Sequence, residues 1–538
     1  MRLLPPVAAA LGAVLLLPQS AVAANPPPGW TPVAYVAGTT DVFNHVSSTA
    51  ANGTDAVVWV ANDTTGVRID ARVRLAGTTA WRGVTPRVRQ AVSAQDLVLT
   101  PTPAGTFFLA WVRYTGGHPE VLSMTLDPRS RTWSKPLQVF HDTGYGHAGP
   151  DVAIAADGTI GVTAYARPDT SSNPPVYRVV VGMRHPDGSW HHRFLTPVDK
   201  HSTGERISAN PAGDFLVSWI EGYNLSEMTV RAATRHHGAD QPWRFATLSD
   251  PGDSQRVHQA IGRDGTAAVI WSATSQSFNA IRMSTTKIST GAPTWSRQDV
   301  VTSTPIGIDA YAAVYKTGHV SALWSQGGQL WTRLLSGGTL GGPVQLSATG
   351  HTGVLASLVM QPNGRAAVLY HQYSGSDNEG LRLRTLTDGV PSAEVVLTDY
   401  FNGDANQERL GINAANRHNV VWTRGAFPNP TDVASMGDPL PRPSVMTSQY
   451  SGLTVTKAVV RGTPRVGRRL SCATGFWVEA AGVSYRWYRD GSRIAHAIGR
   501  TYLLRSADLH RHLSCRATGA DSAGGKRTLA SNAVRVTS

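Results

Sequence analysis

The chain has 538 residues, which is too long for one simple core, so the sequence predicts at least two domains. Charged residues make up only 16% of the chain, while 53 glycines and 33 prolines favour many short strands joined by turns. The net charge of +13 is unevenly distributed, because residues 453–538 hold 15 Lys and Arg against four Asp and Glu and the rest of the chain is almost neutral.

The N-terminal segment has the pattern of a secretory signal peptide. Arg2 precedes an apolar run from Val7 to Leu17, and Ala21-Val22-Ala23 follows it. A basic start, a short apolar run and an Ala-x-Ala end are typical of export signals, and the run is too short to span a bilayer comfortably. We therefore expect residues 1–23 to be removed, no later membrane span, and a secreted protein that is extracellular or associated with the cell wall. An uncleaved anchor is the alternative.

A short unit recurs through residues 25–450. Asp264-Gly265 is followed by the apolar segment Thr266 to Ile270 and then by Trp271. An Asp-Gly pair can supply the positive φ values of a two-residue hairpin turn. Similar units end on aromatic residues that are 46 to 54 positions apart, namely Trp59, Trp111, Tyr165, Trp219, Trp271, Trp324, Tyr370 and Trp422. The step from turn to aromatic is six residues except at Tyr165, where it is seven and the register can slip by one.

Repeats of this length and composition predict an all-β fold, a β-propeller. Each unit would form a four-stranded blade, with an Arg-bearing third strand such as Val230-Arg231 and a fourth strand that opens on Trp, as at Trp243. The last third strand is expected near Val445 to Gln449. The eighth unit lacks a fourth-strand Trp, and Gly29-Trp30-Thr31-Pro32-Val33 matches the missing motif. We therefore expect an eight-bladed propeller over residues 25–450, closed by the N-terminal strand; seven blades or an open stack of β repeats are the alternatives.

Residues 451–538 show a different pattern. Cys472 and Cys515, the two cysteines of the chain, flank Trp487, and in an exported protein such a pair is expected to form a disulfide. Cys, Trp and Cys at these spacings indicate an immunoglobulin-like (Ig-like) β-sandwich, in which the Trp packs on a disulfide between the two sheets. Two isolated thiols are not a zinc ligand set, so a zinc site is not expected here.

Several motifs of this segment resemble the Ig-like modules that are appended to secreted actinobacterial proteins. They are Gly462-Thr463-Pro464-Arg465-Val466-Gly467, Trp487-Tyr488-Arg489-Asp490-Gly491, and Thr501-Tyr502 with Ala507-Asp508. The basic composition suggests a polyanionic partner, such as an anionic cell-wall polymer, an acidic polysaccharide or extracellular DNA. A solvated basic face without a partner is the alternative.

The usual catalytic and metal-binding motifs are missing from the sequence. It holds no His-Glu-x-x-His, Gly-x-Ser-x-Gly, P-loop or Cys-x-x-Cys. His191-His192 and His236-His237 lie near predicted outer-strand turns, so we interpret both pairs as solvated turns. The sequence therefore predicts neither a metal site nor a cofactor.

Arginines precede three of the predicted inner strands, at Arg206, Arg256 and Arg409. Loops that enter inner strands converge on one mouth of a propeller channel, where several arginines can bind a carboxylate through paired hydrogen bonds. Further candidates from similar loops are Asp142, Tyr145 and His147.

These arginines and the turn–strand–aromatic units resemble the sialidase superfamily, whose propellers bind a sugar carboxylate with an Arg triad and use a Tyr–Glu pair with an Asp acid. The leading hypothesis is a secreted, non-catalytic and monomeric binding protein. Its propeller mouth would recognise a glycan or a protein, and its basic C-terminal domain would attach to an anionic surface polymer. A secreted glycoside hydrolase or lyase with its site at the same mouth is the competing hypothesis, and a structural spacer is the third.

Overall fold

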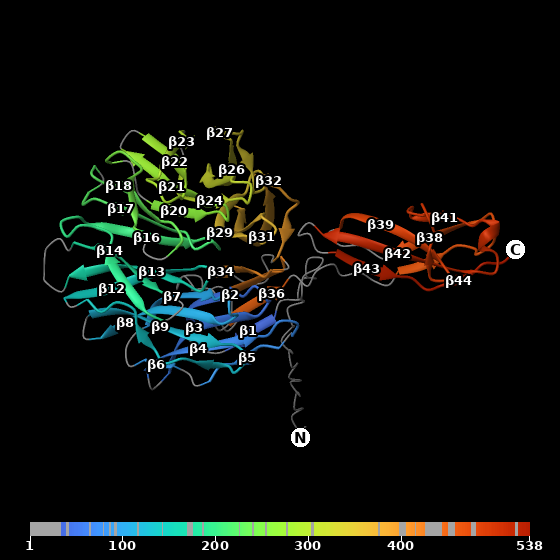
Figure 1. The fold of residues 1–538 in the computed structure, drawn as a ribbon, viewed down its shortest axis with the longest axis horizontal. Coiled ribbons are helices and arrows are strands. Elements are labelled where there is room, and N and C mark those ends of the chain that lie inside the picture. The colour runs from blue at the N-terminus through green and yellow to red at the C-terminus, as the bar shows by residue number, and fades with distance from the viewer. Residues whose placement is uncertain are drawn as a thin grey trace, which may run out of the picture.

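Figure 1 shows a computed structural model of the chain, which is built almost entirely from β-strands. The structure describes residues 34–38, 42–424, 444–449 and 458–538, apart from gaps at 64–65, 79, 86–87, 91–93, 116–117, 143, 169–175, 186–187, 225, 239–240, 253–255, 276–277, 303–305, 375–376, 398–404, 415, 475–479 and 522–525. The predicted signal peptide and the Gly29–Val33 motif lie outside the described residues. None of the described helices is long and apolar enough to cross a membrane.

Between residues 34 and 449, the described strands form eight antiparallel sheets of four or five strands. The first strand of each sheet precedes the recurring turn; in chain order these are β2 (Val42–Thr49), β7 (Ala94–Pro101), β12 (Tyr145–Ile154), β16 (Ser202–Ala209), β20 (Arg256–Ile261), β24 (Ile306–Val314), β29 (Thr352–Met360) and β34 (Ala405–Ile412). The second strands follow the turn and are β3 (Asp55–Asp63), β8 (Phe107–Thr115), β13 (Ile160–Pro168), β17 (Phe215–Glu221), β21 (Thr266–Ser275), β25 (Val320–Gln326), β30 (Ala366–Ser374) and β35 (His418–Arg424).

The third and fourth strands complete each sheet on its outer side. The third strands are β4 (Gly66–Arg74), β9 (His118–Asp127), β14 (Arg178–Arg184), β18 (Thr229–Arg235), β22 (Phe278–Lys287), β26 (Gln329–Ser336), β31 (Asp377–Thr387) and β36 (Ser444–Gln449). The fourth strands are β5 (Arg82–Gly83), β10 (Thr132–Trp133), β15 (Trp190–Phe194), β19 (Arg244–Thr247), β23 (Ser296–Val301), β27 (Thr339–Leu340), β32 (Val390–Pro391) and β1 (Ala34–Gly38). Four short strands also pair with third strands: β6 (Val88–Gln90), β11 (Leu137–Gln138), β28 (Val344–Gln345) and β33 (Val395–Val396).

The eight sheets form a closed ring, an arrangement consistent with a β-propeller (Figure 1). Each first strand contacts the first strand of the next sheet, and β34 contacts β2. The last sheet has the order β1-β36-β35-β34, so a strand from the N-terminal end of the chain pairs with β36. This pairing follows the predicted closure, although the strand begins at Ala34, directly after the predicted motif. It also covers an edge that would otherwise be open to pairing with another chain.

The recurring turns are longer than predicted. At the turn between β20 and β21, Gly262 N–H donates to Thr266 O at 2.7 Å and Gly265 N–H donates to Gly262 O at 3.0 Å, so four residues connect the strands. The prediction of a two-residue turn was wrong, because Gly265 takes a positive φ of 84° while Asp264 does not. Asn416, which replaces the Gly in the eighth unit, also takes a positive φ of 58°, as Asn tolerates better than most residues.

Among the recurring aromatics whose side chains the structure describes, all but Tyr165 pack between neighbouring sheets. Trp111, Trp271 and Trp324 are fully buried, each among apolar residues of the preceding sheet. Tyr165 does not belong to this set, because Ala164 stands six residues after the turn Gly and is buried in that place, while Tyr165 is partly exposed. The register slip is therefore real, and it places Tyr165 at the margin of the core rather than inside it.

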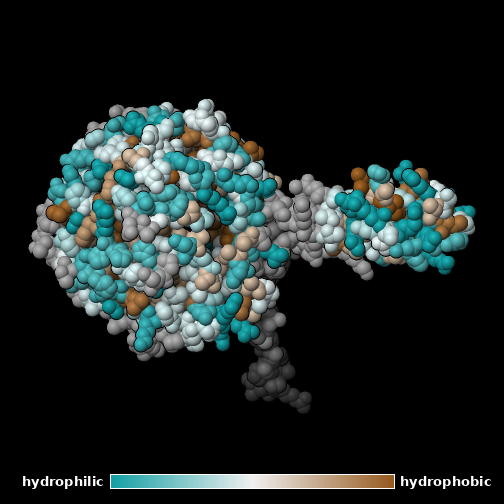
Figure 2. Space-filling model, viewed as in Figure 1, coloured by the Kyte–Doolittle hydropathy of each residue, from teal (hydrophilic) through white to brown (hydrophobic). Residues whose placement is uncertain are grey.

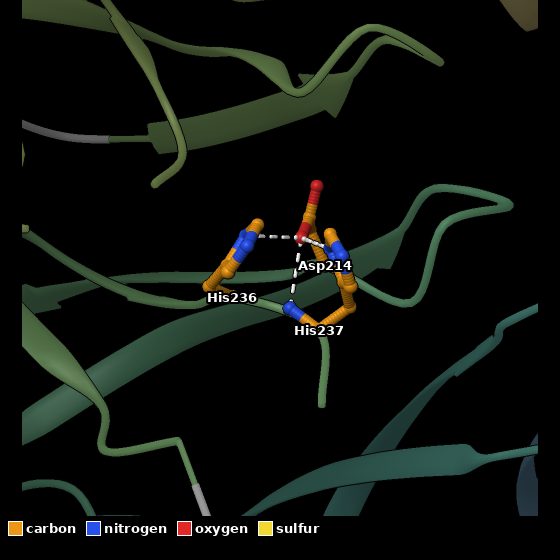
Figure 3. A group of neighbouring side chains, drawn as sticks. All are labelled: Asp214, His236 and His237. Atoms are coloured by element: carbon orange, nitrogen blue, oxygen red, sulfur yellow. Dashed lines mark hydrogen bonds and ion pairs between the residues drawn. The ribbon is translucent and has the colours of Figure 1, made fainter. Parts of the chain in front are cut away.

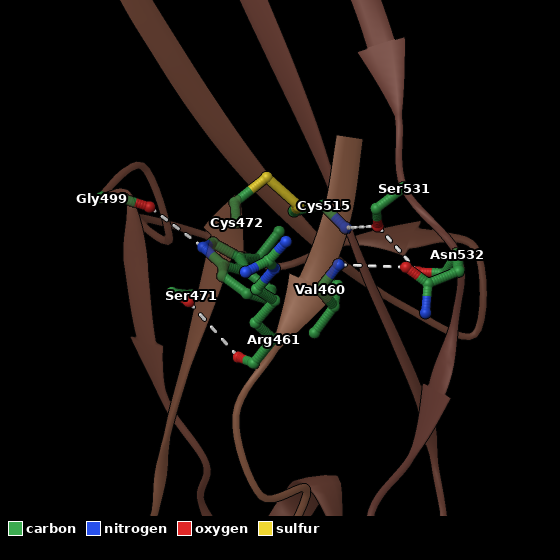
Figure 4. The surroundings of a disulfide bond; sticks show 9 residues. Val460, Arg461, Ser471, Cys472, Gly499, Cys515, Ser531 and Asn532 are labelled. Atoms are coloured by element: carbon green, nitrogen blue, oxygen red, sulfur yellow. Dashed lines mark hydrogen bonds between the residues drawn. A yellow bond between two sulfur atoms is a disulfide. The ribbon is translucent and has the colours of Figure 1, made fainter. Parts of the chain in front are cut away.

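The C-terminal residues form two further sheets, drawn in red in Figure 1. One contains β37 (Ala458–Arg461), β38 (Arg469–Thr474) and β41 (Thr501–Leu503); the other contains β39 (Ala480–Arg489), β40 (Ser492–Arg493), β42 (His512–Asp521), β43 (Lys526–Ala530) and β44 (Val534–Arg535). The predicted Cys472–Cys515 disulfide is present and joins β38 to β42, and hence one sheet to the other (Figure 4). Trp487 is fully buried in the same core cluster, and its Nε1 donates to Gly499 O at 3.0 Å.

The face of the molecule drawn in Figure 2 is mostly polar in both parts. On the face shown in Figure 2, apolar residues are scattered among hydrophilic ones rather than gathered in one large area. No large apolar patch of the described residues therefore marks a binding surface on this face.

Candidate functional site

The three predicted arginines lie on first strands, and all three are exposed. Arg206 pairs with Ser218 and Arg409 with Val421. Both arginines therefore occupy the same position of the repeat, opposite the residue that precedes the recurring aromatic. Arg256 begins β20, whose neighbour in the ring is β16, whereas β34 lies four sheets away from β16. The structure thus brings Arg206 and Arg256 to neighbouring strands and places Arg409 on the other side of the ring.

A β-bulge shapes this end of the first strands. The pairing register shifts between Thr203 and Arg206 in β16, and between Asn406 and Arg409 in β34. Five other first strands have a shift at the same place among the described residues. Bulges re-aim side chains at the rims of such sheets. In β16 the result is a buried Glu205 directly followed by an exposed Arg206.

Four neighbouring first strands place polar residues at the repeat position of Arg206. These are Asp151 in β12, Arg206 in β16, His258 in β20 and Tyr311 in β24, each paired with the residue before the packing position. The rings of His258 and Tyr311 are 4.1 Å apart, and Asp151 Oδ2 accepts a hydrogen bond from Ile207 N–H at 3.0 Å. We call these four residues, with Glu205, Arg256 and Asp309, the inner-strand cluster.

Burial and the charges of its two arginines together set the electrostatics of the inner-strand cluster. Arg256 Nη1 lies 2.7 Å from Asp309 Oδ1, in an ion pair that is about half exposed. Burial lowers the pKa of His258 to about 4, and the charges of Arg206 and Arg256 act in the same direction, against Asp309. His258 is therefore a neutral imidazole at pH 7, able to donate one hydrogen bond and accept another.

Glu205 is the unusual acid of this cluster. Burial raises its pKa to about 8, Arg206 opposes the rise, and the nearby Asp151 adds to it. A Cβ atom added at Gly149 would lie 2.7 Å from Tyr165 Cε1 and 3.4 Å from Glu205 Oε1. The side chains of Tyr165 and Glu205 therefore both lie beside Gly149. Glu205 is therefore protonated at neutral pH, the state in which a carboxyl group can donate a hydrogen bond or a proton.

A row of aromatic rings begins at Tyr165, beside Glu205. The ring of Tyr165 is 5.4 Å from that of Tyr177, which is 5.1 Å from His201, and His201 stacks at 5.8 Å on Tyr223. Tyr223 is exposed, while Tyr165, Tyr177 and His201 are partly exposed. Aromatic faces with polar tips suit the faces of sugar rings, so this row extends the inner-strand cluster toward solvent.

The other predicted residues belong to β12 and the loop before it, but their side chains contact the outer strands. Asp142 Oδ1 is 2.8 Å from His192 Nε2 in β15, and Asp142 Oδ2 is 3.4 Å from His147 Nε2. Tyr145 contacts the outer strands instead, because its hydroxyl accepts a hydrogen bond from Arg178 Nη1 at 3.4 Å and its ring is 5.2 Å from Phe194. The structure thus brings Asp142 and His147 together, but their described contacts lead to β14 and β15 rather than to Arg206 and Arg256.

A cavity of about 260 Å³ opens beside these outer strands. His185, His191 and His192 line it from the third sheet, and Arg235 and Trp243 line it from the fourth. His191 and His192 lie within β15, so the prediction that this pair forms a turn was wrong.

The second histidine pair faces an acid that the sequence did not connect with it. Among the described residues, one group brings three possible metal-ligand atoms within 4.8 Å of one another, and it consists of Asp214, His236 and His237 (Figure 3). His236-His237 lies in the bend that follows β18 and His237 is exposed, as predicted, but His236 is only 22% exposed and both rings face Asp214. The sequence offered little indication of this group, because Asp214 lies in a different turn from His236 and His237.

Comparisons with known proteins connect the chain with solved structures only. No family model matches it, and no curated protein matches it. Similar structures include a protein of unknown function from Dyadobacter fermentans (16% identity, 66% of this chain and 94% of that one, TM-score 0.38), a polysaccharide lyase (10%, 68% and 91%, 0.42) and a Hadza microbial sialidase (10%, 74% and 76%, 0.35). Because these similarities are low, we argue the function of this chain from its own residues.

Proposed function

We propose that this chain is a secreted, non-catalytic binding protein that recognises an acidic glycan at the inner-strand cluster. Its N-terminal part would be an eight-bladed propeller closed by β1, and its C-terminal part an Ig-like module. The closed ring of eight sheets and the two-sheet C-terminal part with its disulfide support this architecture. The predicted signal peptide supports secretion.

One observation carries the ligand assignment: the exposed Arg206 and Arg256 stand on neighbouring strands around a neutral His258. Two guanidinium groups attract a carboxylate and can bind it through paired hydrogen bonds. The aromatic row from Tyr165 to Tyr223 adds faces on which sugar rings can stack. An acidic glycan satisfies both features, whereas a neutral glycan or a simple anion satisfies one.

The test uses the full-length protein and an array of matched acidic and neutral oligosaccharides, at low and high salt. We expect binding to acidic members that persists at high salt, and a loss of at least about tenfold in Arg206→Ala and Arg256→Ala. Arg409→Ala is the matched control, because Arg409 has the same repeat position on the other side of the ring. Equal binding of acidic and neutral members, or an equal loss in all three variants, would overturn the proposal.

The C-terminal module would attach the protein to an anionic surface polymer. Its stretch from 461 to 469 exposes four arginines, namely Arg461, Arg465, Arg468 and Arg469. Such a concentration of charge binds polyanions in a salt-dependent way. Replacing these four residues by Gln should reduce the fraction of protein retained on purified cell walls at low salt, and wild-type protein should be released at high salt. Retention that is unchanged by the replacements would contradict this role.

Glu205 favours a second candidate function, a glycoside hydrolase or lyase. A protonated carboxyl group with a pKa of about 8, next to Tyr165 and near Asp151, has the properties of a general acid. In that case the acidic glycan that binds would also be cleaved, and Glu205→Gln would abolish cleavage while keeping binding. A ligand recovered intact after long incubation with wild-type protein supports the binding function instead.

A further inference from the structure

The corner formed by Asp214, His236 and His237 lies at the end of the fourth sheet where the turn joins β16 to β17, whereas Arg206 lies in the middle of β16, opposite Ser218. Asp214 directly precedes β17, and the two histidines directly follow β18, which pairs with β17. His236 Nδ1 is 2.9 Å from Asp214 Oδ1 and His237 Nδ1 is 2.8 Å from the same oxygen (Figure 3). The main-chain N–H of His237 donates to this oxygen as well, at 2.9 Å. Two imidazoles thus converge on one carboxylate oxygen.

Asn210 holds the carboxylate in place from behind. Its Nδ2 donates to Asp214 Oδ2 at 2.8 Å and its Oδ1 accepts a hydrogen bond from Asp214 N–H at 3.0 Å. Because Oδ2 is occupied by Asn210, Oδ1 is the oxygen that faces the histidines. Support of this kind, from a residue behind the ligand, is what orients the ligands of protein metal sites. Asp214 itself is buried, so its carboxylate cannot turn away into solvent.

The other repeats show that this corner departs from the local rule. The residue after the turn Gly is Thr in four repeats, at Thr54, Thr106, Thr159 and Thr266, whereas it is Asp214 here. In the fifth sheet the place of His236 is taken by Lys287, which pairs with Asp264 and so neutralises its own corner. In the fourth sheet the acid is Asp214, which follows the turn Gly, whereas Asp264 of the fifth sheet precedes it. His236 and His237 stand where the fifth sheet has the cation Lys287. The fifth sheet forms the same turn without an acid after the turn Gly and without a histidine pair. Turn formation and sheet packing therefore do not require these residues in the fourth sheet.

The donor set fits a transition-metal ion rather than a hard cation. One carboxylate oxygen and two imidazole nitrogens are ligands that Zn²⁺ accepts, with bonds of about 2.0–2.2 Å, whereas Ca²⁺ and Mg²⁺ prefer oxygen alone. Tetrahedral bonds of that length place neighbouring ligand atoms about 3.3 Å apart, so the observed 2.8 and 2.9 Å need a small outward movement of the rings. His237 is half exposed and supplies both the freedom to move and a path for entry.

We propose that Asp214, His236 and His237 bind one divalent transition-metal ion, Zn²⁺ by ligand type. Three protein ligands leave a fourth coordination position, which opens toward solvent on the side of His237 and can hold water or a small anion. The ion would tie the end of β18 to the turn between β16 and β17. This assignment is independent of the glycan site, because none of its three ligands belongs to the inner-strand cluster.

The experiment titrates Zn²⁺ into full-length protein that carries no affinity tag and has been dialysed against a chelator, with calorimetry as the readout. We expect one ion per chain, and an affinity at least about tenfold weaker in Asp214→Asn and His237→Ala. His237→Ala keeps the test valid if Asp214→Asn does not fold, because His237 is half exposed. His191→Ala is the matched control, since it removes one member of the other histidine pair and should leave Zn²⁺ binding unchanged.

Two further readouts separate a metal site from a hydrogen-bonded His–Asp–His corner. Co²⁺ bound to wild-type protein should give the visible absorption of a tetrahedral site, and this absorption should be absent in His236→Ala. Zn²⁺ should raise the melting temperature of wild-type protein but not that of the variant. Binding weaker than about 0.1 mM, or one-site binding that survives in both Asp214→Asn and His237→Ala, would overturn the proposal. Ca²⁺ should not compete, and full competition by Ca²⁺ would likewise contradict it.

Discussion

Arg74 and Asn419 are 345 positions apart in the sequence and are joined by a hydrogen bond of 3.0 Å, from Arg74 Nη2 to Asn419 Oδ1. Arg74 ends the third strand of the first sheet, and Asn419 lies in the second strand of the last sheet. The same guanidinium pairs with the buried Asp55, with 2.8 Å between Nη2 and Oδ2. One buried cation therefore links the two sheets between which the ring closes.

Arg74→Met should strongly weaken the contact between the first and the last sheet, which we call the seam of the ring. The replacement leaves Asp55 buried without its cation, which in comparable buried pairs costs about 3–5 kcal/mol of the free energy of unfolding. Urea unfolding followed by tryptophan fluorescence measures the loss. The control is Arg297→Met, which breaks the exposed Arg297–Asp250 pair and should cost less than about 1 kcal/mol. Equal losses in the two variants would show that the buried pair does not stabilise the closure.

Gly411→Ala should disturb the same seam by overpacking. A Cβ atom at this position would lie 2.0 Å from Thr49 Oγ1 and 3.2 Å from the main-chain nitrogen of Thr49, so β34 and β2 would have to separate. We expect a loss of about 1–3 kcal/mol in the free energy of unfolding. Gly342→Ala is the control, because nothing lies within 4 Å of the added atom. A melting temperature equal to that of the control would contradict the close approach of the two strands.

Glu205 should make stability depend on pH. Its pKa is about 8 in the folded protein, against an ordinary value of 4.5. Between these values the folded state holds a proton that the unfolded state has released, so the free energy of unfolding falls as the pH rises from about 4.5 to 8. Glu205→Gln should flatten this dependence and be more stable than wild type at pH 8, by on the order of a few kcal/mol. Unfolding at pH 5, 6, 7 and 8 tests this, with the exposed Glu227→Gln as control; parallel curves for all three proteins would refute it.

The Cys472–Cys515 disulfide should stabilise the two C-terminal sheets that it joins. It joins positions 43 residues apart, and in the chain-entropy model a loop of that length contributes roughly 4 kcal/mol. Reduction, or replacement of both cysteines by Ser, should therefore lower the unfolding temperature of this part selectively. Differential scanning calorimetry with and without reductant measures it. The transition of the ring of sheets is the internal control, because no other cysteine exists in the chain.

The repeat was readable from the sequence because its signals are local. A turn residue with positive φ followed six positions later by an aromatic predicts the second strand of each sheet, and Trp271 and Trp324 are buried as this predicts. The last third strand was placed near Val445 to Gln449 and lies at Ser444–Gln449. The disulfide was likewise predictable, since the chain has two cysteines and each therefore has one possible partner within it.

The candidate sites were only partly readable. The sequence indicated Arg206 and Arg256 but not His258, Tyr311 or Glu205, because these meet across strands that are about 50 residues apart. Bulges add to the difficulty, since one extra residue changes which side chain turns outward. The grouping of Asp214 with His236 and His237 was not predictable for the same reason. Neither an Asp after a turn Gly nor a His-His pair indicates a site by itself.

By itself, the sequence determined that this chain forms repeated strands, where the turns lie, and which cysteines pair, because backbone propensities and side-chain periodicity act over a few residues. Only the tertiary structure decided which side chains share a site. The closed ring places β16 beside β20, and the pairing of β17 with β18 places Asp214 against His236 and His237. These contacts depend on register and ring closure, which are set by the packing of whole sheets rather than by any short segment.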